Sequence, residues 1–140
     1  MPSRESGEAR RRIRLAGPTA LGDAIASTRG YGLELDLGEL DLARLCIIVE
    51  ELITNLCEHG VCDTEHEIAV ELFRQAGGLG LVFEDNGAAF DPRSAVDVED
   101  MPDRGGGAGL RLVRAWSQVV SYESANGRNR LELLLALTGS

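Results

Sequence analysis

The chain has 140 residues and a formal net charge of −9, from 23 acidic and 14 basic side chains, with 44% apolar and 26% charged residues. These values indicate one soluble globular domain, and they argue against nucleic acid as the main partner because contacts with phosphate need a basic surface. No apolar run reaches the ~18 residues that span a bilayer, and the N-terminus lacks the features of a signal peptide, so we expect no membrane partner and a cytoplasmic location.

The hydropathy pattern predicts a disordered polar tail over residues 1–10 and a single domain over residues 11–140. In chain order, the predicted elements are a strand (11–15), a helix from Thr19 to about Arg29, a helix (about 40–59), two strands (66–74 and 79–85), a long loop (86 to about 108), a helix (109–120) and a closing hairpin. Helices on one face of a mixed, mostly antiparallel sheet fit this order best, which is a two-layer α/β sandwich of the α+β class.

The stretch from residue 51 to residue 66 contains four side chains of the kinds that bind metals: Cys57, His59, Cys62 and His66. On a continuous helix Cys57 and His59 point in nearly opposite directions, whereas a tetrahedral metal site needs four converging ligands. The spacing also lacks the paired knuckles of zinc sites, so a structural metal is the less favoured interpretation. The odd number of cysteines, without a signal peptide, predicts reduced thiols rather than a disulfide framework.

The same stretch contains Glu51 and Asn55, four residues apart, which a helix would place one above the other on a polar face. Such a pair is by itself typical of a solvated helix face. Asp85 ends the predicted strand before Asn86-Gly87, where its carboxylate could accept a hydrogen bond from an exocyclic amine such as that of adenine. Gly87 would let the backbone approach a flat base, although the same three residues are also common in ordinary turns.

Three glycines, Gly105, Gly107 and Gly109, alternate up to the first residue of the predicted helix (109–120). Backbone N–H groups exposed at a helix N-terminus bind phosphate well, and glycine permits the tight turns that expose them. A glycine run alone would fit a flexible linker. In this order, after Glu-x₃-Asn and Asp-x-Gly, it predicts a nucleotide site.

The segments "VEELITNLCEHG", "FEDNGAAFDP" and "GGGAGLRLVRAW" resemble the three nucleotide-binding boxes of the GHKL-type ATPase superfamily, which includes gyrase-type ATPases and histidine kinases. More closely, they resemble the small anti-sigma-factor serine/threonine kinases, over roughly residues 11–137. The resemblance implies a GHKL ATPase fold with ATP and Mg²⁺ as cofactors. Three departures are Ala89, where the family usually has Gly or Pro, Ala108, which replaces a common Leu, and a short acidic lid over about residues 93–104.

The resemblance also implies a role for each motif residue. Glu51 would be the general base, and Asn55 would be the Mg²⁺ ligand. Asp85 would accept a hydrogen bond from the adenine amino group, and His59 would support the end of the helix. Around the base, Gly87 would shape the pocket and Asn129 would be a polar contact of adenine. Around the phosphates, the lid and phosphate cradle would be formed by Gly105, Gly107 and Gly109, with Leu110 behind them. Arg104 would be a further phosphate partner.

The function implied by the resemblance is an ATP-dependent serine/threonine protein kinase that acts as an anti-sigma factor in a partner-switching pathway. It would phosphorylate an anti-sigma-factor antagonist, bind a sigma factor or another regulatory protein, and form a homodimer, with no direct nucleic acid partner. The alternative is an ATP- or ADP-binding regulatory module that sequesters a protein partner and has little or no kinase activity.

Overall fold

The computed structural model describes residues 10–59, 67–87 and 105–138. Within these residues the elements are, in chain order, β1 (Arg11–Ala16), the 3-10 turn η1 (Gly17–Thr19), α2 (Ala20–Glu34), α3 (Glu39–His59), β2 (Glu67–Gln75), β3 (Gly78–Asp85), α4 (Gly105–Trp116), β4 (Ser117–Ala125) and β5 (Arg128–Ala136). The tail predicted over residues 1–10 lies outside the described residues except for Arg10, whose guanidinium pairs with the Glu71 carboxylate at 3.0 Å.

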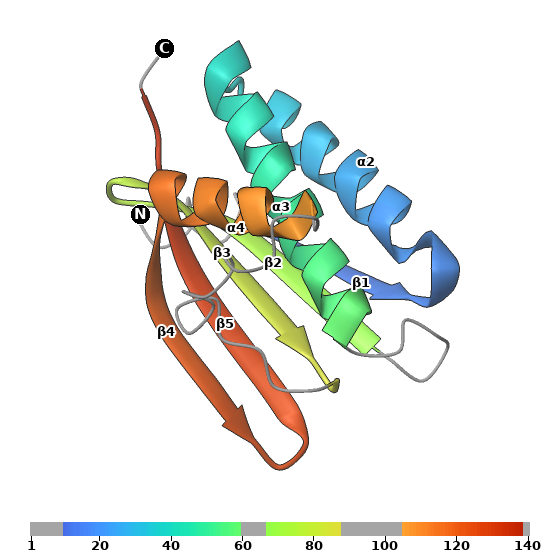
Figure 1. Cartoon of the computed structure of the whole chain (residues 1–140). Coiled ribbons are helices and arrows are strands. Elements are labelled where there is room, and N and C mark those ends of the chain that lie inside the picture. The colour runs from blue at the N-terminus through green and yellow to red at the C-terminus, as the bar shows by residue number, and fades with distance from the viewer. Residues whose placement is uncertain (1–9, 60–66, 88–104, 139–140) are drawn as a thin grey trace.

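The described strands form one antiparallel sheet in the order β1-β2-β3-β5-β4. Helices α2, α3 and α4 lie on one face of this sheet, and no described helix covers the other face (Figure 1). The predicted α+β two-layer sandwich is therefore confirmed, with every described strand pair antiparallel. None of the described helices is long and apolar enough to cross a membrane.

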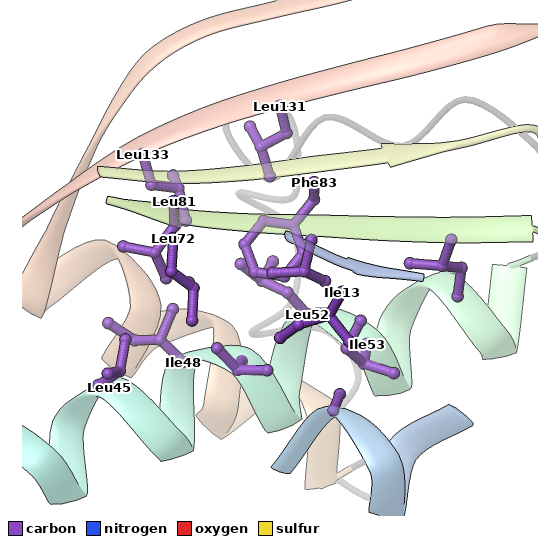
Figure 2. Close-up of a cluster of buried hydrophobic side chains, with 14 of the residues drawn as sticks. Ile13, Leu45, Ile48, Leu52, Ile53, Leu72, Leu81, Phe83, Leu131 and Leu133 are labelled. Atoms are coloured by element: carbon purple, nitrogen blue, oxygen red, sulfur yellow. The ribbon is translucent and has the colours of Figure 1, made fainter. Parts of the chain in front are cut away.

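The hydrophobic core lies between the inner face of the sheet and helix α3 (Figure 2). Apolar residues of α3 recur at helical spacing and so form one continuous stripe, which packs against the inward side chains of the strands. The side chains labelled in Figure 2 are all at most 8% exposed and come from both layers: Ile13, Leu45, Ile48, Leu52, Ile53, Leu72, Leu81, Phe83, Leu131 and Leu133. This packing fixes the polar face of α3 relative to the strand ends.

Helix α2 is longer than the sequence predicts, because it continues through Gly30 and Gly32 to Glu34. A Cβ atom built on Gly32 would lie 2.5 Å from Cδ1 of Leu42 in α3. Gly32 is therefore a point of close contact between two helices and not a helix end, so the predicted end at Arg29 is wrong. At the other end of α2, the Thr19 hydroxyl donates to the Asp23 carboxylate at 3.0 Å and makes no side-chain cap to the backbone.

The last helix also differs from its prediction of 109–120, since α4 spans Gly105–Trp116 and the chain is strand β4 from Ser117 onward. The early start is hidden in the sequence because glycine is a poor helix former. The early end follows from pairing with β5, which places Ser117 opposite Leu135 and draws Val119 into the sheet opposite Leu133. Such β-branched residues fit a half-buried strand well.

Candidate functional site

Asp85 is the last residue of β3, and its side chain is held in one place by hydrogen bonds. It is only 2% exposed. The backbone N–H of Gly87 donates to its Oδ2 at 3.0 Å, and the Asn129 side-chain Nδ2 donates to its Oδ1 at 3.1 Å. A buried carboxylate needs such donors, because an unpaired one carries a large desolvation penalty. The predicted strand-end carboxylate is thus fixed in orientation.

The turn after β3 is tied to its neighbours through two further contacts. The Asn86 side-chain oxygen accepts a hydrogen bond from the backbone N–H of Glu67, at the start of β2, at 2.8 Å. The Asn129 Nδ2 atom also donates to the carbonyl oxygen of Gly87 at 2.9 Å. The Asp-Asn-Gly segment is therefore anchored to both strands that flank β3, which gives Gly87 a defined position beside Asp85.

Glu51 and Asn55 lie one turn apart on α3, as the sequence predicts. Asn55 is 4% exposed, and its Nδ2 donates to the backbone carbonyl of Glu51 at 2.7 Å. The donor end of the amide is thus used within the helix, and its oxygen is the end available to a ligand. A neutral oxygen is a suitable ligand for Mg²⁺ shared with phosphates, so the residues present fit that ion.

A small cavity lies between α3 and the ends of strands β3, β4 and β5. Its volume is about 10 Å³, and its lining consists of Leu52, Leu56, Phe83, Asp85, Tyr122, Asn129 and Leu131. The walls are mostly apolar, with Asp85 and Asn129 supplying polar atoms, a lining typical of ligand sites. Such sites usually measure ~300–1,000 Å³, so a bound base would require the lining side chains to move apart. Asn55 lies in the helical turn between Leu52 and Leu56.

Two residues of this region, Tyr122 and Ser124, are absent from the sequence-based site. Both belong to β4, where Tyr122 pairs with Leu131 and Ser124 pairs with Asn129. The Ser124 hydroxyl donates to the Asn129 side-chain oxygen at 2.6 Å. The alternation in "VVSYES" could have placed both side chains on one face of a strand. Assigning residues 109–120 to a helix hid where that strand begins.

The predicted phosphate-binding glycines lie in a helix and not in the loop that the sequence predicts. Gly105, Gly107, Gly109 and Leu110 all lie within the first turns of α4, whereas Arg104 and the acidic lid lie outside the described residues, as does Ala89. Helix α4 packs against α3, and its start lies beside α3 in Figure 1. At its other end, the Arg44 guanidinium of α3 lies 5.1 Å from the centre of the Trp116 ring.

A larger cavity, of about 630 Å³, opens elsewhere and is lined by residues of β1, β2, β3, β4 and β5. Its walls carry four arginines and three glutamates around alanines: Arg12, Arg14, Arg128, Arg130, Glu67, Glu84, Glu123, Ala16, Ala69 and Ala125. Among the predicted site residues that the structure describes, only Asn129 reaches it. Size alone does not make it the nucleotide site, because Asp85, Glu51 and Asn55 do not line it.

Of the two described cysteines, Cys46 agrees with the prediction of reduced thiols and Cys57 does not. Cys57 is disulfide-bonded, so the prediction of reduced thiols is wrong for this residue. Cys46 is a free thiol, and burial raises its pKa. Cys62 and His66 lie outside the described residues, and the described part of the chain contains no group of three or more His, Cys, Asp or Glu side chains that could hold a metal. A disulfide sulfur is no thiolate ligand.

Comparison with known proteins identifies a matching family and a related kinase. The family model described as "Histidine kinase-like ATPase domain" matches residues 15–135. The chain is 34% identical, over 95 residues, to the serine/threonine-protein kinase BtrW of Bordetella bronchiseptica, covering 64% of this chain and 66% of that relative. The chain thus spans somewhat less than two thirds of the relative's length.

The fold is also similar to two solved structures of low sequence identity. One is a chain in the crystal structure of the SiaB-SiaC complex from Pseudomonas aeruginosa, with a TM-score of 0.57 at 13% identity, covering 91% of this chain and 89% of that chain. The other is the Acinetobacter baumannii histidine kinase AdeS, with a TM-score of 0.51 at 10% identity, covering 91% of this chain and 68% of that one. At these identities the likeness establishes the fold.

Proposed function

Because the chain belongs to the histidine kinase-like ATPase domain family, we propose that it binds ATP between α3 and the strand ends and transfers the γ-phosphoryl group to a serine or threonine of a partner protein. The observation that carries this proposal is the fixed Asp85 carboxylate in the lining of a mostly apolar cavity, beside the turn of α3 that holds Asn55. A serine/threonine-protein kinase among its relatives supports the same reaction.

Base recognition depends on the acceptor character of Asp85. Its two oxygens accept hydrogen bonds from Gly87 and Asn129, and a carboxylate has about four lone-pair sites in all. An exocyclic amine would be a further donor to the same carboxylate. Leu52, Leu56 and Phe83 would contact the faces of the base, with the gain in free energy that accompanies burial of apolar surface.

Phosphoryl transfer in such a site consists mainly of positioning and charge neutralisation. Asn55 would hold Mg²⁺ through its side-chain oxygen, and the ion, when bound, neutralises the triphosphate. Glu51, half-buried on the same helical face, would accept the proton of the attacking hydroxyl. The first turns of α4, rich in glycine, would direct backbone N–H groups at the phosphates, with Arg104 as a further phosphate partner.

The protein substrate we propose is an anti-sigma-factor antagonist with an acceptor serine or threonine. A sigma factor or another regulatory protein would be the second partner, so that phosphorylation switches the chain between the two, and the working form would be a homodimer in the cytoplasm. A chain of similar fold was crystallised as part of the SiaB-SiaC complex, which supports a fold suited to protein partners. The family resemblance of the sequence supports the partner class.

The experiment is a transfer assay with radiolabelled ATP, Mg²⁺ and a small antagonist protein that carries an acceptor serine or threonine. We expect the wild-type chain to yield phosphoprotein and Glu51→Ala to lower the rate about 100-fold or more, the usual contribution of a general base, while ATP still binds. Glu50→Ala is the matched control, since Glu50 is the exposed neighbour on the same helix. Transfer by Glu51→Ala at the wild-type rate would refute this mechanism. ATP binding without transfer by the wild type would favour a sequestering module.

A further inference from the structure

A chain of hydrogen bonds runs from the edge of the sheet to Asp85. Ser124 of β4 donates to the Asn129 side-chain oxygen at 2.6 Å. The nitrogen of the same amide donates to Asp85 Oδ1 at 3.1 Å and to the Gly87 carbonyl at 2.9 Å. Gly87 in turn donates its N–H to Asp85 Oδ2 at 3.0 Å. The contacts thus link an edge strand, a central strand and the turn after β3.

Only one orientation of the Asn129 amide satisfies this network. Its nitrogen faces two oxygens that can only accept, those of Asp85 and Gly87, so the reversed amide would set oxygen against oxygen. The amide oxygen must then face Ser124, which donates to it. Asn129 is 6% exposed, and a buried amide oxygen without a donor would be costly. Ser124 therefore completes the contacts that hold the amide plane.

The position of Ser124 is set by the hairpin between β4 and β5. Asn126 and Gly127 form its two-residue turn with positive φ angles of 57° and 75°, as a type I′ turn requires. This turn fixes the register in which Ser124 lies opposite Asn129. Two pairs further from the turn, on the same face of the hairpin, Tyr122 lies opposite Leu131, and both line the small cavity.

We propose that Ser124 and Asn129 are positioning residues that make the site selective for a purine with an exocyclic amine, an inference that rests on the proposed nucleotide binding. Asn129 acts through Asp85, because its amide nitrogen donates to Asp85 and Gly87 and its oxygen accepts from Ser124. With the amide held, Asp85 presents a fixed acceptor to the amine. Without the fixed Asn129 amide, the Asp85 carboxylate can rotate, and selectivity for a purine with an exocyclic amine falls.

The test measures binding of two nucleotides to each variant by calorimetry: ATP, and purine riboside triphosphate, which lacks the amine. We expect the wild type to bind ATP at least about tenfold more tightly than purine riboside triphosphate, because a hydrogen bond to a charged acceptor contributes that much affinity. In Ser124→Ala the ratio of the two dissociation constants should fall about three- to tenfold, with most of the loss in ATP affinity. Ser124→Thr, which keeps the hydroxyl in a strand-favouring residue, should restore the ratio.

The matched control is Ser121→Ala, the same substitution on the same strand at a position opposite Glu132 rather than Asn129. It should leave the ratio unchanged. In an Asp85→Asn background, Ser124→Ala should have no further effect, since its influence passes through that carboxylate. Equal weakening of both nucleotides by Ser124→Ala, or an unchanged ratio, would overturn the positioning role alone. Failure of the wild type to bind ATP would overturn the proposed function as well.

Discussion

At the scale of single residues, buried polar side chains of this chain join segments that are distant in sequence. Asp85 and Asn129 do so at the site, and Asp41 does so at the opposite end of α3. Asp41 is 2% exposed in the first turn of α3, and its carboxylate accepts from the backbone N–H of Thr138 at 3.0 and 3.1 Å and from the Thr138 hydroxyl at 3.1 Å. The last described residue is thereby held to the start of the main helix.

Removing this carboxylate should destabilise the protein. We expect Asp41→Ala to lower the free energy of unfolding by about 1–3 kcal/mol, because the Thr138 donors lose their partner and the helix loses a favourable charge in its first turn. Urea denaturation measures the change. Glu39→Ala is the control, since Glu39 is also acidic and in the first turn but exposed. A loss no larger for Asp41→Ala than for Glu39→Ala would contradict the tie.

At the scale of elements, the packing of α2 on α3 explains why a glycine-containing segment is helical. Gly30 and Gly32 lie on the same helix, yet a Cβ on Gly30 would meet nothing within 4 Å, whereas one on Gly32 would lie 2.5 Å from Leu42 Cδ1 and 3.4 Å from Leu37 Cδ1. Intrinsic propensity disfavours both glycines equally. Tertiary contact distinguishes them.

Alanine substitutions at these two glycines should therefore have different effects. Gly30→Ala should stabilise the protein by about 0.5–1 kcal/mol, since alanine is the better helix former and has room there. Gly32→Ala should stabilise it less or destabilise it, because Leu42 must move. Melting temperatures of the two variants, compared under one condition, decide the matter. Equal stabilisation by both would show that α2 and α3 do not pack closely at Gly32.

The first turns of α4 are the other element in which sequence and structure disagree. Residues 105–109 include four glycines, and each lowers helix stability by about 1 kcal/mol relative to alanine, so this end of α4 has little intrinsic preference for helix. Val113, fully buried, anchors the middle of α4 in the core. Packing at its centre therefore stabilises α4, whereas its glycine-rich first turns gain little stability from intrinsic helix propensity.

At the scale of the whole molecule, the two faces of the sheet are stabilised differently. The inner face carries the hydrophobic core, while the other face carries ion pairs: Glu84 lies 3.3 Å from Arg12 and 3.7 Å from Arg130, and Arg130 lies 3.3 Å from Glu132. These side chains are 23–43% exposed, so solvent weakens each pair. Glu84 is the shared partner of two arginines from strands on opposite sides of β3.

Neutralising Glu84 should reveal this contribution. We expect Glu84→Gln to lower stability by about 0.5–1 kcal/mol at low salt, and by less in 1 M NaCl, because salt screens exposed charges. Glu123→Gln is the control on the same face, where Glu123 is exposed and opposite Arg130. Chemical denaturation at two salt concentrations gives the result. A loss independent of salt would show that Glu84 acts by packing instead of by charge.

The sequence by itself determined what depends on local spacing. Period-3.6 apolar residues place Glu51 and Asn55 on one face of α3, alternation yields β2, and the apolar run after Gly77-Gly78 yields β3. The ordered motifs point to a nucleotide-binding family, which the match over residues 15–135 confirms. Only the tertiary structure decided which residues meet across distance. Asn129 reaches Asp85 because β3 pairs with β5, 44 positions later in the chain, and Ser124 joins them through the register of the last hairpin. A local pattern states which face a side chain occupies. It does not state which strand lies beside it, because strand order depends on how the whole core packs.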